Sequence, residues 1–158
     1  MVRQCRDEKD VSEIIPNLWL GNYKSALSKN FISRHNIKYI INATKEYPNA
    51  FENDDIKYLK IPFNDSDSCY KDVNKMFDTC YIFILNALKE KSSILVHCKK
   101  GHHRSASIVA SFLIRYLGLD YITIVLYINK LRKCALTRNA CILRAVYEYY
   151  IKYSYLDK

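Results

Sequence analysis

A histidine-cysteine pair and an arginine, separated by five residues, are the part of this chain best equipped for chemistry. The segment reads Val96-His97-Cys98-Lys99-Lys100-Gly101-His102-His103-Arg104-Ser105. An apolar run precedes the pair and an apolar helical pattern follows from Ala106, so we expect a tight loop between a strand and a helix N-terminus. Such a loop gathers backbone N–H groups around an anion, and its positive field favours the thiolate form of a cysteine. We therefore expect Cys98 to attack a phosphorus atom bound in the loop.

The segment resembles the signature of the protein tyrosine phosphatase superfamily, which reads His-Cys, five residues, Arg, and then Ser or Thr. Ser105-Ala106-Ser107 is similar to the corresponding residues of the dual-specificity branch. The resemblance covers roughly Ile14 to Tyr150. It implies an α/β cysteine-phosphatase fold, in which helices flank a central, mostly parallel, twisted sheet. It also implies one catalytic domain over residues 1–158, with a loosely ordered, charged N-terminus at residues 1–13.

The resemblance and the chemistry of phosphate esters assign roles to these residues. Cys98 attacks phosphorus, Arg104 contacts two phosphate oxygens, and Ser105 stabilises the thiolate when it leaves in a second step. We expect the substrate to be bound by Lys99, Lys100, Gly101, His102, His103 and Arg104, whose backbone amides hold the remaining charge. His97 is expected to support the loop through a hydrogen bond. Because amides and Arg104 neutralise the phosphoryl charge, we expect no metal ion and no cofactor.

The departing oxygen of the ester needs a proton, which a nearby carboxylic acid can supply. Two candidates, Asp65 and Asp67, follow the strand that Pro62 ends. The resemblance, a strand ending in Ile-Pro followed by two residues and Asp, selects Asp65, whereas the spacing to Cys98 favours Asp67. We expect Asp65 to be the general acid and keep Asp67 as the alternative.

Asn139 matches an asparagine that braces the phosphate-binding loop in the family. Cys134 and Arg138 stand where relatives have prolines, so this connection departs from the family pattern. A plain helix N-cap is the other interpretation of Asn139, and the two roles are compatible.

The remaining sequence predicts the elements that position the loop. Hydrophobic periodicity predicts strands over residues 14–22, 37–41, 56–61 and 94–96, and helices over residues 23–34, 73–88, 105–117, 121–133 and 141–153. Strands that alternate with helices indicate a mostly parallel sheet, whose ligands bind at the carboxyl ends of the strands. Cys98 and Asp65 both follow such ends, so we expect them to face one site.

The predicted substrates are phosphotyrosine and phosphoserine or phosphothreonine proteins. Within the region of resemblance only about eighty residues, 14–93, precede the nucleophile strand, whereas superfamily members specific for phosphotyrosine look longer and have a deeper pocket. The basic loop supports an alternative, because it is similar to loops of phosphatases that act on inositol pyrophosphates, and Lys99 resembles the lysine of phosphoinositide phosphatases. An RNA 5′-triphosphate is a further alternative, although the Thr-His pair typical of that branch is absent. A phosphoprotein-binding pseudophosphatase is less favoured, because Cys98 and Arg104 are both present.

Composition narrows the class of protein. The chain has 25 Lys and Arg against 16 Asp and Glu, and its formal charge of +9 favours anionic partners. Nucleic acid would suit this charge, but no other feature supports that partner. No apolar run reaches the ~18 residues that a membrane-spanning helix needs, and residues 1–13 contain no signal-peptide core. Six cysteines without metal-ligand spacing, one of them nucleophilic, favour a reducing compartment, so we expect a cytoplasmic location.

Overall fold

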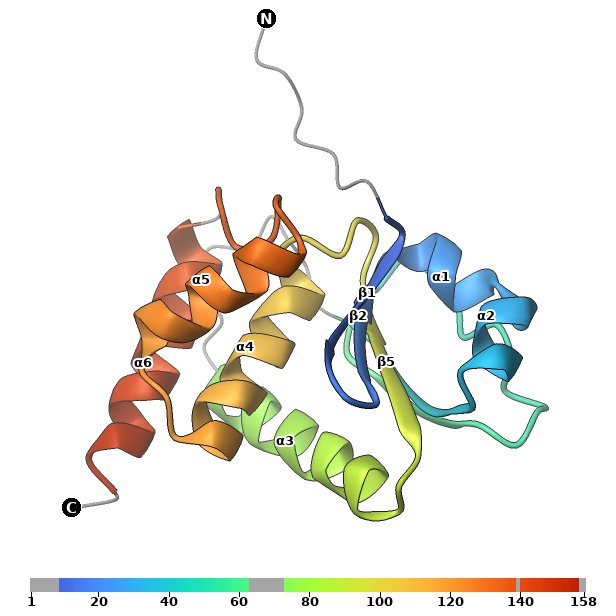
Figure 1. Cartoon of the computed structure of the whole chain (residues 1–158), viewed down its shortest axis with the longest axis horizontal. Helices are drawn as coiled ribbons and strands as arrows, with labels where there is room; N and C mark the ends of the chain where they lie inside the picture. The colour runs from blue at the N-terminus through green and yellow to red at the C-terminus, as the bar shows by residue number, and fades with distance from the viewer. Residues whose placement is uncertain (1–8, 63–72, 139, 157–158) are drawn as a thin grey trace, which may run out of the picture.

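The computed structural model of this chain describes residues 9–62, 73–138 and 140–156 (Figure 1). Its strands are β1 (Val11–Ile15), β2 (Leu18–Gly21), β3 (Ile37–Asn42), β4 (Lys57–Lys60) and β5 (Ser93–His97). Its helices are α1 (Tyr23–Leu27), α2 (Lys29–Arg34), α3 (Val73–Lys89), α4 (Arg104–Leu117), α5 (Tyr121–Leu131) and α6 (Ala140–Ser154). Strands and helices are interspersed along the chain, with two strands in succession at β1-β2 and at β3-β4 and three helices in succession after β5.

The strands form one sheet in the order β1-β2-β5-β3-β4. Only β1 pairs antiparallel with its neighbour, and the other pairs are parallel. All residues of β5 are buried, because this strand lies at the centre of the sheet with helices on both faces. The predicted α/β fold with a central, mostly parallel sheet is confirmed. Residues that follow β5 therefore emerge at the middle of one sheet edge, where ligands of such sheets bind.

Helices cover the two faces of the sheet unequally. Figure 1 shows α1 and α2 on one face and the other four helices on the opposite face. The smaller core, under α1 and α2, consists of Ala26, Ile32, Ile37, Ile40 and Leu95. The larger core includes most of α4, which is buried from its first residue to Ile114. Since α4 packs against the sheet, α3, α5 and α6, its N-terminus is a rigid support for the loop after β5.

The first predicted strand, over residues 14–22, is wrong in its extent. β1 and β2 are two antiparallel strands, joined at Pro16 and Asn17. Pro16 has no N–H to donate, and Asn17 adopts a left-handed φ of 70°, so the chain reverses there. Residues 11–13 belong to β1, so the expected loose N-terminus does not extend to residue 13.

The helix predicted over residues 23–34 is also wrong, because it is broken at Ser28. The Ser28 backbone lies in the extended region and ends α1. Its hydroxyl accepts a hydrogen bond from the Phe31 N–H at 3.2 Å and begins α2 as an N-cap. A single serine thus divides one apolar helical pattern into two short helices.

Candidate active site

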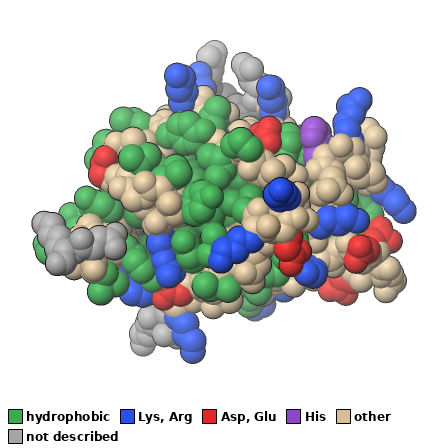
Figure 2. Space-filling model, turned by 60° about the horizontal axis from the view of Figure 1, so that its bottom comes forward, with side chains coloured by type: hydrophobic (Ala, Val, Ile, Leu, Met, Phe, Trp, Pro, Cys, Tyr) green, Lys and Arg blue, Asp and Glu red, His purple; other side chains and the backbone are tan. Residues whose placement is uncertain are grey.

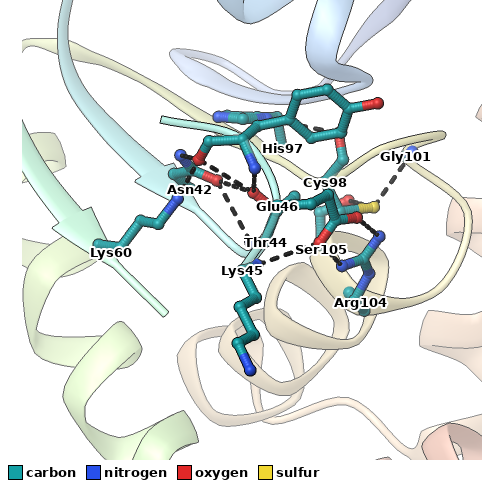
Figure 3. A network of polar contacts seen from close by, with 11 residues as sticks. Asn42, Thr44, Lys45, Glu46, Lys60, His97, Cys98, Gly101, Arg104 and Ser105 are labelled. Carbon is teal, nitrogen blue, oxygen red and sulfur yellow. Dashed lines mark hydrogen bonds and ion pairs between the residues drawn. The ribbon is translucent and has the colours of Figure 1, made fainter. Parts of the chain in front are cut away.

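The loop between β5 and α4, residues 98–103, is called the nucleophile loop below together with Arg104, the first residue of α4, and it wraps around the Cys98 thiol (Figure 3). Cys98 is 3% exposed. Its Sγ accepts hydrogen bonds from the Gly101 N–H at 3.2 Å and from the Ser105 hydroxyl at 3.1 Å. Two donors therefore point at the sulfur, the atom predicted to attack phosphorus.

Gly101 allows the nucleophile loop to turn tightly against β2. Its φ of 71° lies in the left-handed region, which favours glycine. A Cβ at this position would lie 2.6 Å from the backbone oxygen of Gly21. Cβ atoms in proteins essentially never come within 3.0 Å of another heavy atom in this way, so a larger residue would force the backbone to move. Gly101, predicted as a substrate-binding residue, thus places its own N–H on the Cys98 thiol.

Arg104 begins α4, and a carboxylate from another loop holds its guanidinium. Its Nη1 donates to Glu46 Oε2 at 3.1 Å, and its Nη2 donates to Glu46 Oε1 at 2.8 Å (Figure 3). The Arg104 side chain is 6% exposed, and that of Glu46 is 44% exposed. The hydrogen bonds from Arg104 lower the pKa of Glu46 to about 2, so Glu46 is a carboxylate at neutral pH. Sequence reasoning missed Glu46, because no local signal pairs residues 58 positions apart.

A polar network at the end of β3 fixes the segment that carries Glu46. Asn42 Oδ1 accepts hydrogen bonds from the Thr44 hydroxyl at 2.6 Å and from the Thr44 N–H at 3.2 Å. Asn42 Nδ2 donates to the Tyr47 carbonyl at 2.9 Å. The Tyr47 ring stacks on Tyr23 of α1, with ring centroids 4.7 Å apart and planes at 5°. Because both sides of Glu46 are held, its carboxylate reaches Arg104 from a defined position.

His97 lies beneath the nucleophile loop and is buried, with 3% of its surface exposed. Burial lowers the pKa of His97 to about 4, and the charges of Lys60 and Arg104 act in the same direction. The imidazole is therefore neutral at physiological pH. Its Nδ1 lies 3.4 Å from the Cys98 carbonyl oxygen, where it can donate a hydrogen bond to the loop backbone. This contact suits the supporting role predicted for His97.

A cavity of about 110 Å³ opens beside the thiol. The residues that line it come from two segments, the nucleophile loop and the segment before α6, and are Cys98, Lys100, His102, His103, Cys134, Thr137 and Arg138. Lys99, also predicted to bind substrate, is exposed but does not line this cavity. Arg138, which the sequence did not single out for binding, adds a cation from a distant part of the chain. The positive side chains around the opening favour an anionic ligand.

Three predicted site residues, Asp65, Asp67 and Asn139, lie outside the described residues. Within the described ranges, no three His, Cys, Asp or Glu side chains are grouped so that they could hold a metal ion. In those same ranges, each helix is too short or too polar to cross a membrane.

Comparison with known proteins places this site in a family. Residues 18–152 match the family described as "Dual specificity phosphatase, catalytic domain". The chain belongs to this family. The matched range includes the complete nucleophile loop, with Cys98 and Arg104.

Individual relatives agree with the family match. The chain is 39% identical over 110 residues to "Dual specificity protein phosphatase Mpk3" of Drosophila melanogaster, with 68% of this chain and 26% of that protein covered. It is 34% identical over 109 residues to human "Dual specificity protein phosphatase 9", with 68% and 28% covered. The chain thus spans about a quarter of the length of these two relatives.

Solved structures share the fold of this dual specificity phosphatase domain. The crystal structure of DUSP15 is similar with a TM-score of 0.82 at 26% identity, covering 91% of this chain and 89% of that chain. The crystal structure of human DUSP28 gives a TM-score of 0.84 at 20% identity, covering 96% and 99%, which is a likeness of fold alone.

Proposed function

We propose that this domain hydrolyses phosphate monoesters on phosphotyrosine and on phosphoserine or phosphothreonine of proteins, through a phosphocysteine intermediate. The observation that carries the proposal is the Cys98 thiol, which accepts two hydrogen bonds at the base of the loop that ends in Arg104. The family match and the relatives named dual specificity protein phosphatases support a protein substrate.

The reaction has two steps. First, the Cys98 thiolate forms a bond to phosphorus while the P–O bond to the leaving group breaks. Arg104 contacts two phosphate oxygens, and N–H groups of the nucleophile loop hold the charge that develops on the third. Second, water attacks the phosphocysteine and the S–P bond breaks. The Ser105 hydroxyl, 3.1 Å from Cys98 Sγ, stabilises the departing thiolate.

A carboxylic acid protonates the leaving oxygen in the first step and, as a carboxylate, accepts a proton from water in the second. We propose Asp65 for this role, with Asp67 as the alternative. Asp65→Asn and Asp67→Asn distinguish them. Loss of the acid slows cleavage of an alkyl phosphate, which has a poor leaving group, far more than cleavage of p-nitrophenyl phosphate. The variant that shows this selective loss identifies the acid, and equal rates for both variants and the wild type would exclude both residues.

The cavity beside Cys98 favours a second candidate function, hydrolysis of a more highly charged phosphate such as an inositol pyrophosphate, a phosphoinositide or an RNA 5′-triphosphate. Lys100 and Arg138 approach the cavity from two separate segments, so a second anionic group of the substrate could pair with them. On the face drawn in Figure 2, Lys and Arg side chains are scattered around exposed hydrophobic side chains.

Phosphate release from three substrates tests these functions together. A phosphotyrosine peptide, a phosphothreonine peptide and an inositol pyrophosphate are compared with wild type, Cys98→Ser and Arg138→Gln. Cleavage of both peptides by the wild type, and by Arg138→Gln but not by Cys98→Ser, supports a dual-specificity protein phosphatase. Preference for the inositol compound, reduced in Arg138→Gln, would favour the second function. Peptide binding without Cys98-dependent release would indicate a phosphoprotein-binding module.

The proposed partners are phosphorylated proteins, and the proposed setting is the reducing interior of a cell, where the Cys98 thiol stays available. Nucleic acid remains a partner that only the net charge of +9 would suit.

A further inference from the structure

Arg132, the residue that follows α5, is a buried arginine in contact with the outer side of the nucleophile loop. It is 1% exposed. Its Nε donates to the Gly101 carbonyl at 3.2 Å, and its Nη2 donates to the Lys100 carbonyl at 3.3 Å. The sequence pattern gave this arginine no role.

The segment that follows α5 also donates a hydrogen bond to a third carbonyl of the nucleophile loop. The Leu136 N–H donates to the His102 carbonyl oxygen at 2.8 Å. The carbonyls of three successive residues, 100, 101 and 102, are therefore bound from outside the loop by residues 132 and 136.

This arrangement fixes which way the loop N–H groups point. The described residues contain no cis peptide bond, and in a trans peptide the C=O and the following N–H point in opposite directions. Carbonyls held on the outside thus direct the N–H groups of Gly101, His102 and His103 to the inside. The Gly101 N–H shows the result, since it reaches Cys98 Sγ at 3.2 Å.

The other end of the guanidinium is anchored to the N-terminal part of the chain. Arg132 Nη1 donates to the Lys9 carbonyl at 3.2 Å and lies 3.3 Å from the Ser12 hydroxyl in β1. Little space is left around this bridge, because a Cβ on Gly101 would lie 2.9 Å from Arg132 Nη2. Arg132 therefore ties the nucleophile loop to β1, and the loop peptides have little freedom to rotate.

We propose that Arg132 is a positioning residue that orients the N–H groups of the nucleophile loop toward the Cys98 thiolate and toward the bound phosphate. Its positive charge, placed on the carbonyl side of these peptides, also polarises their N–H groups toward the anion. The orientation of the N–H groups toward a bound phosphate rests on the proposed function. Their orientation toward the Cys98 thiolate does not.

Arg132→Gln and Arg132→Lys test the inference through the thiol itself. Alkylation of Cys98 by iodoacetamide is followed by mass spectrometry across a pH range, and the affinity for inorganic phosphate is measured by protection from alkylation. In Arg132→Gln the midpoint of alkylation is expected to move about one unit to higher pH, and phosphate affinity to fall about tenfold. Arg132→Lys keeps the charge but lacks the planar fork of donors that holds both carbonyls in a fixed direction, so an intermediate shift is expected.

Arg115→Gln is the matched control. Arg115 lies near the opposite end of α4, stacked 3.8 Å from the centroid of the Tyr81 ring and 4.5 Å from that of Tyr153. Its loss is expected to reduce stability while the alkylation profile and the phosphate affinity stay those of the wild type.

A folded Arg132→Gln variant with the wild-type alkylation profile and phosphate affinity would overturn the inference and leave Arg132 a purely structural residue. If Arg132→Gln does not fold, the same two measurements are made on Arg132→Lys, and a wild-type alkylation profile and phosphate affinity in that variant would overturn the inference. A wild-type protein that releases no phosphate from any substrate, but whose alkylation profile still depends on Arg132, would refute the proposed function and not this inference.

Discussion

Acid should destabilise this protein through His97, the buried imidazole beneath the nucleophile loop. Burial lowers the pKa of His97 from 6.5 to about 4. Between these two values the unfolded chain binds a proton that the folded protein does not bind, so the free energy of unfolding falls as the pH falls. The contribution is fully present above pH 6.5 and is lost as the pH falls toward about 4. The whole shift corresponds to about 3 kcal/mol, of which about 2 kcal/mol is lost by about pH 5.

Urea unfolding of the wild type and of His97→Asn at about pH 7.5 and about pH 5 measures this contribution. Asparagine can still donate to the Cys98 carbonyl, but it does not titrate. Groups common to both proteins cancel, so the wild type is expected to lose about 2 kcal/mol more than the variant on acidification. Equal losses in the two proteins would refute the reasoning, because His97 would then titrate alike in the folded and unfolded chains.

The remaining predictions concern the nucleophile loop. Glu46→Gln removes the charge that holds Arg104, so kcat/KM for a phosphopeptide is expected to fall about tenfold; a rise would show that the carboxylate competes with the substrate. Gly101→Ala places a Cβ 2.6 Å from a backbone oxygen at a φ of 71°. We expect urea unfolding to report a loss of about 1–3 kcal/mol, and unchanged stability would contradict the steric argument. Ser105→Ala removes the hydroxyl 3.1 Å from Cys98 Sγ, so hydrolysis of the phosphocysteine is expected to slow while its formation does not. Rapid mixing should then show a burst of the released alcohol or phenol, followed by slow turnover. A slowed burst would instead place Ser105 in the first step.

The sequence alone predicted the chemistry of the nucleophile loop and determined the class of fold. His97, Cys98, Arg104 and Ser105 lie in one short segment, so the covalent chain itself brings them together once a strand and a helix flank it. The alternation of apolar patterns likewise predicted the α/β sheet, because burial of one face of each element is a local property. Periodicity was less informative where a single residue interrupts a pattern, as Asn17 and Ser28 do.

Only the tertiary structure decided what surrounds that segment. Glu46 meets Arg104 across 58 positions of sequence, and Arg132 meets Gly101 across 31. The first pair forms because β5 lies beside β3, and the second because the segment after α5 packs against the outer side of the loop. A hydrophobic pattern specifies which face of each element is buried, but many strand orders and helix packings satisfy the same pattern. The partners of Arg104 and of the loop carbonyls were therefore set by the packing of distant elements, which local spacing does not encode.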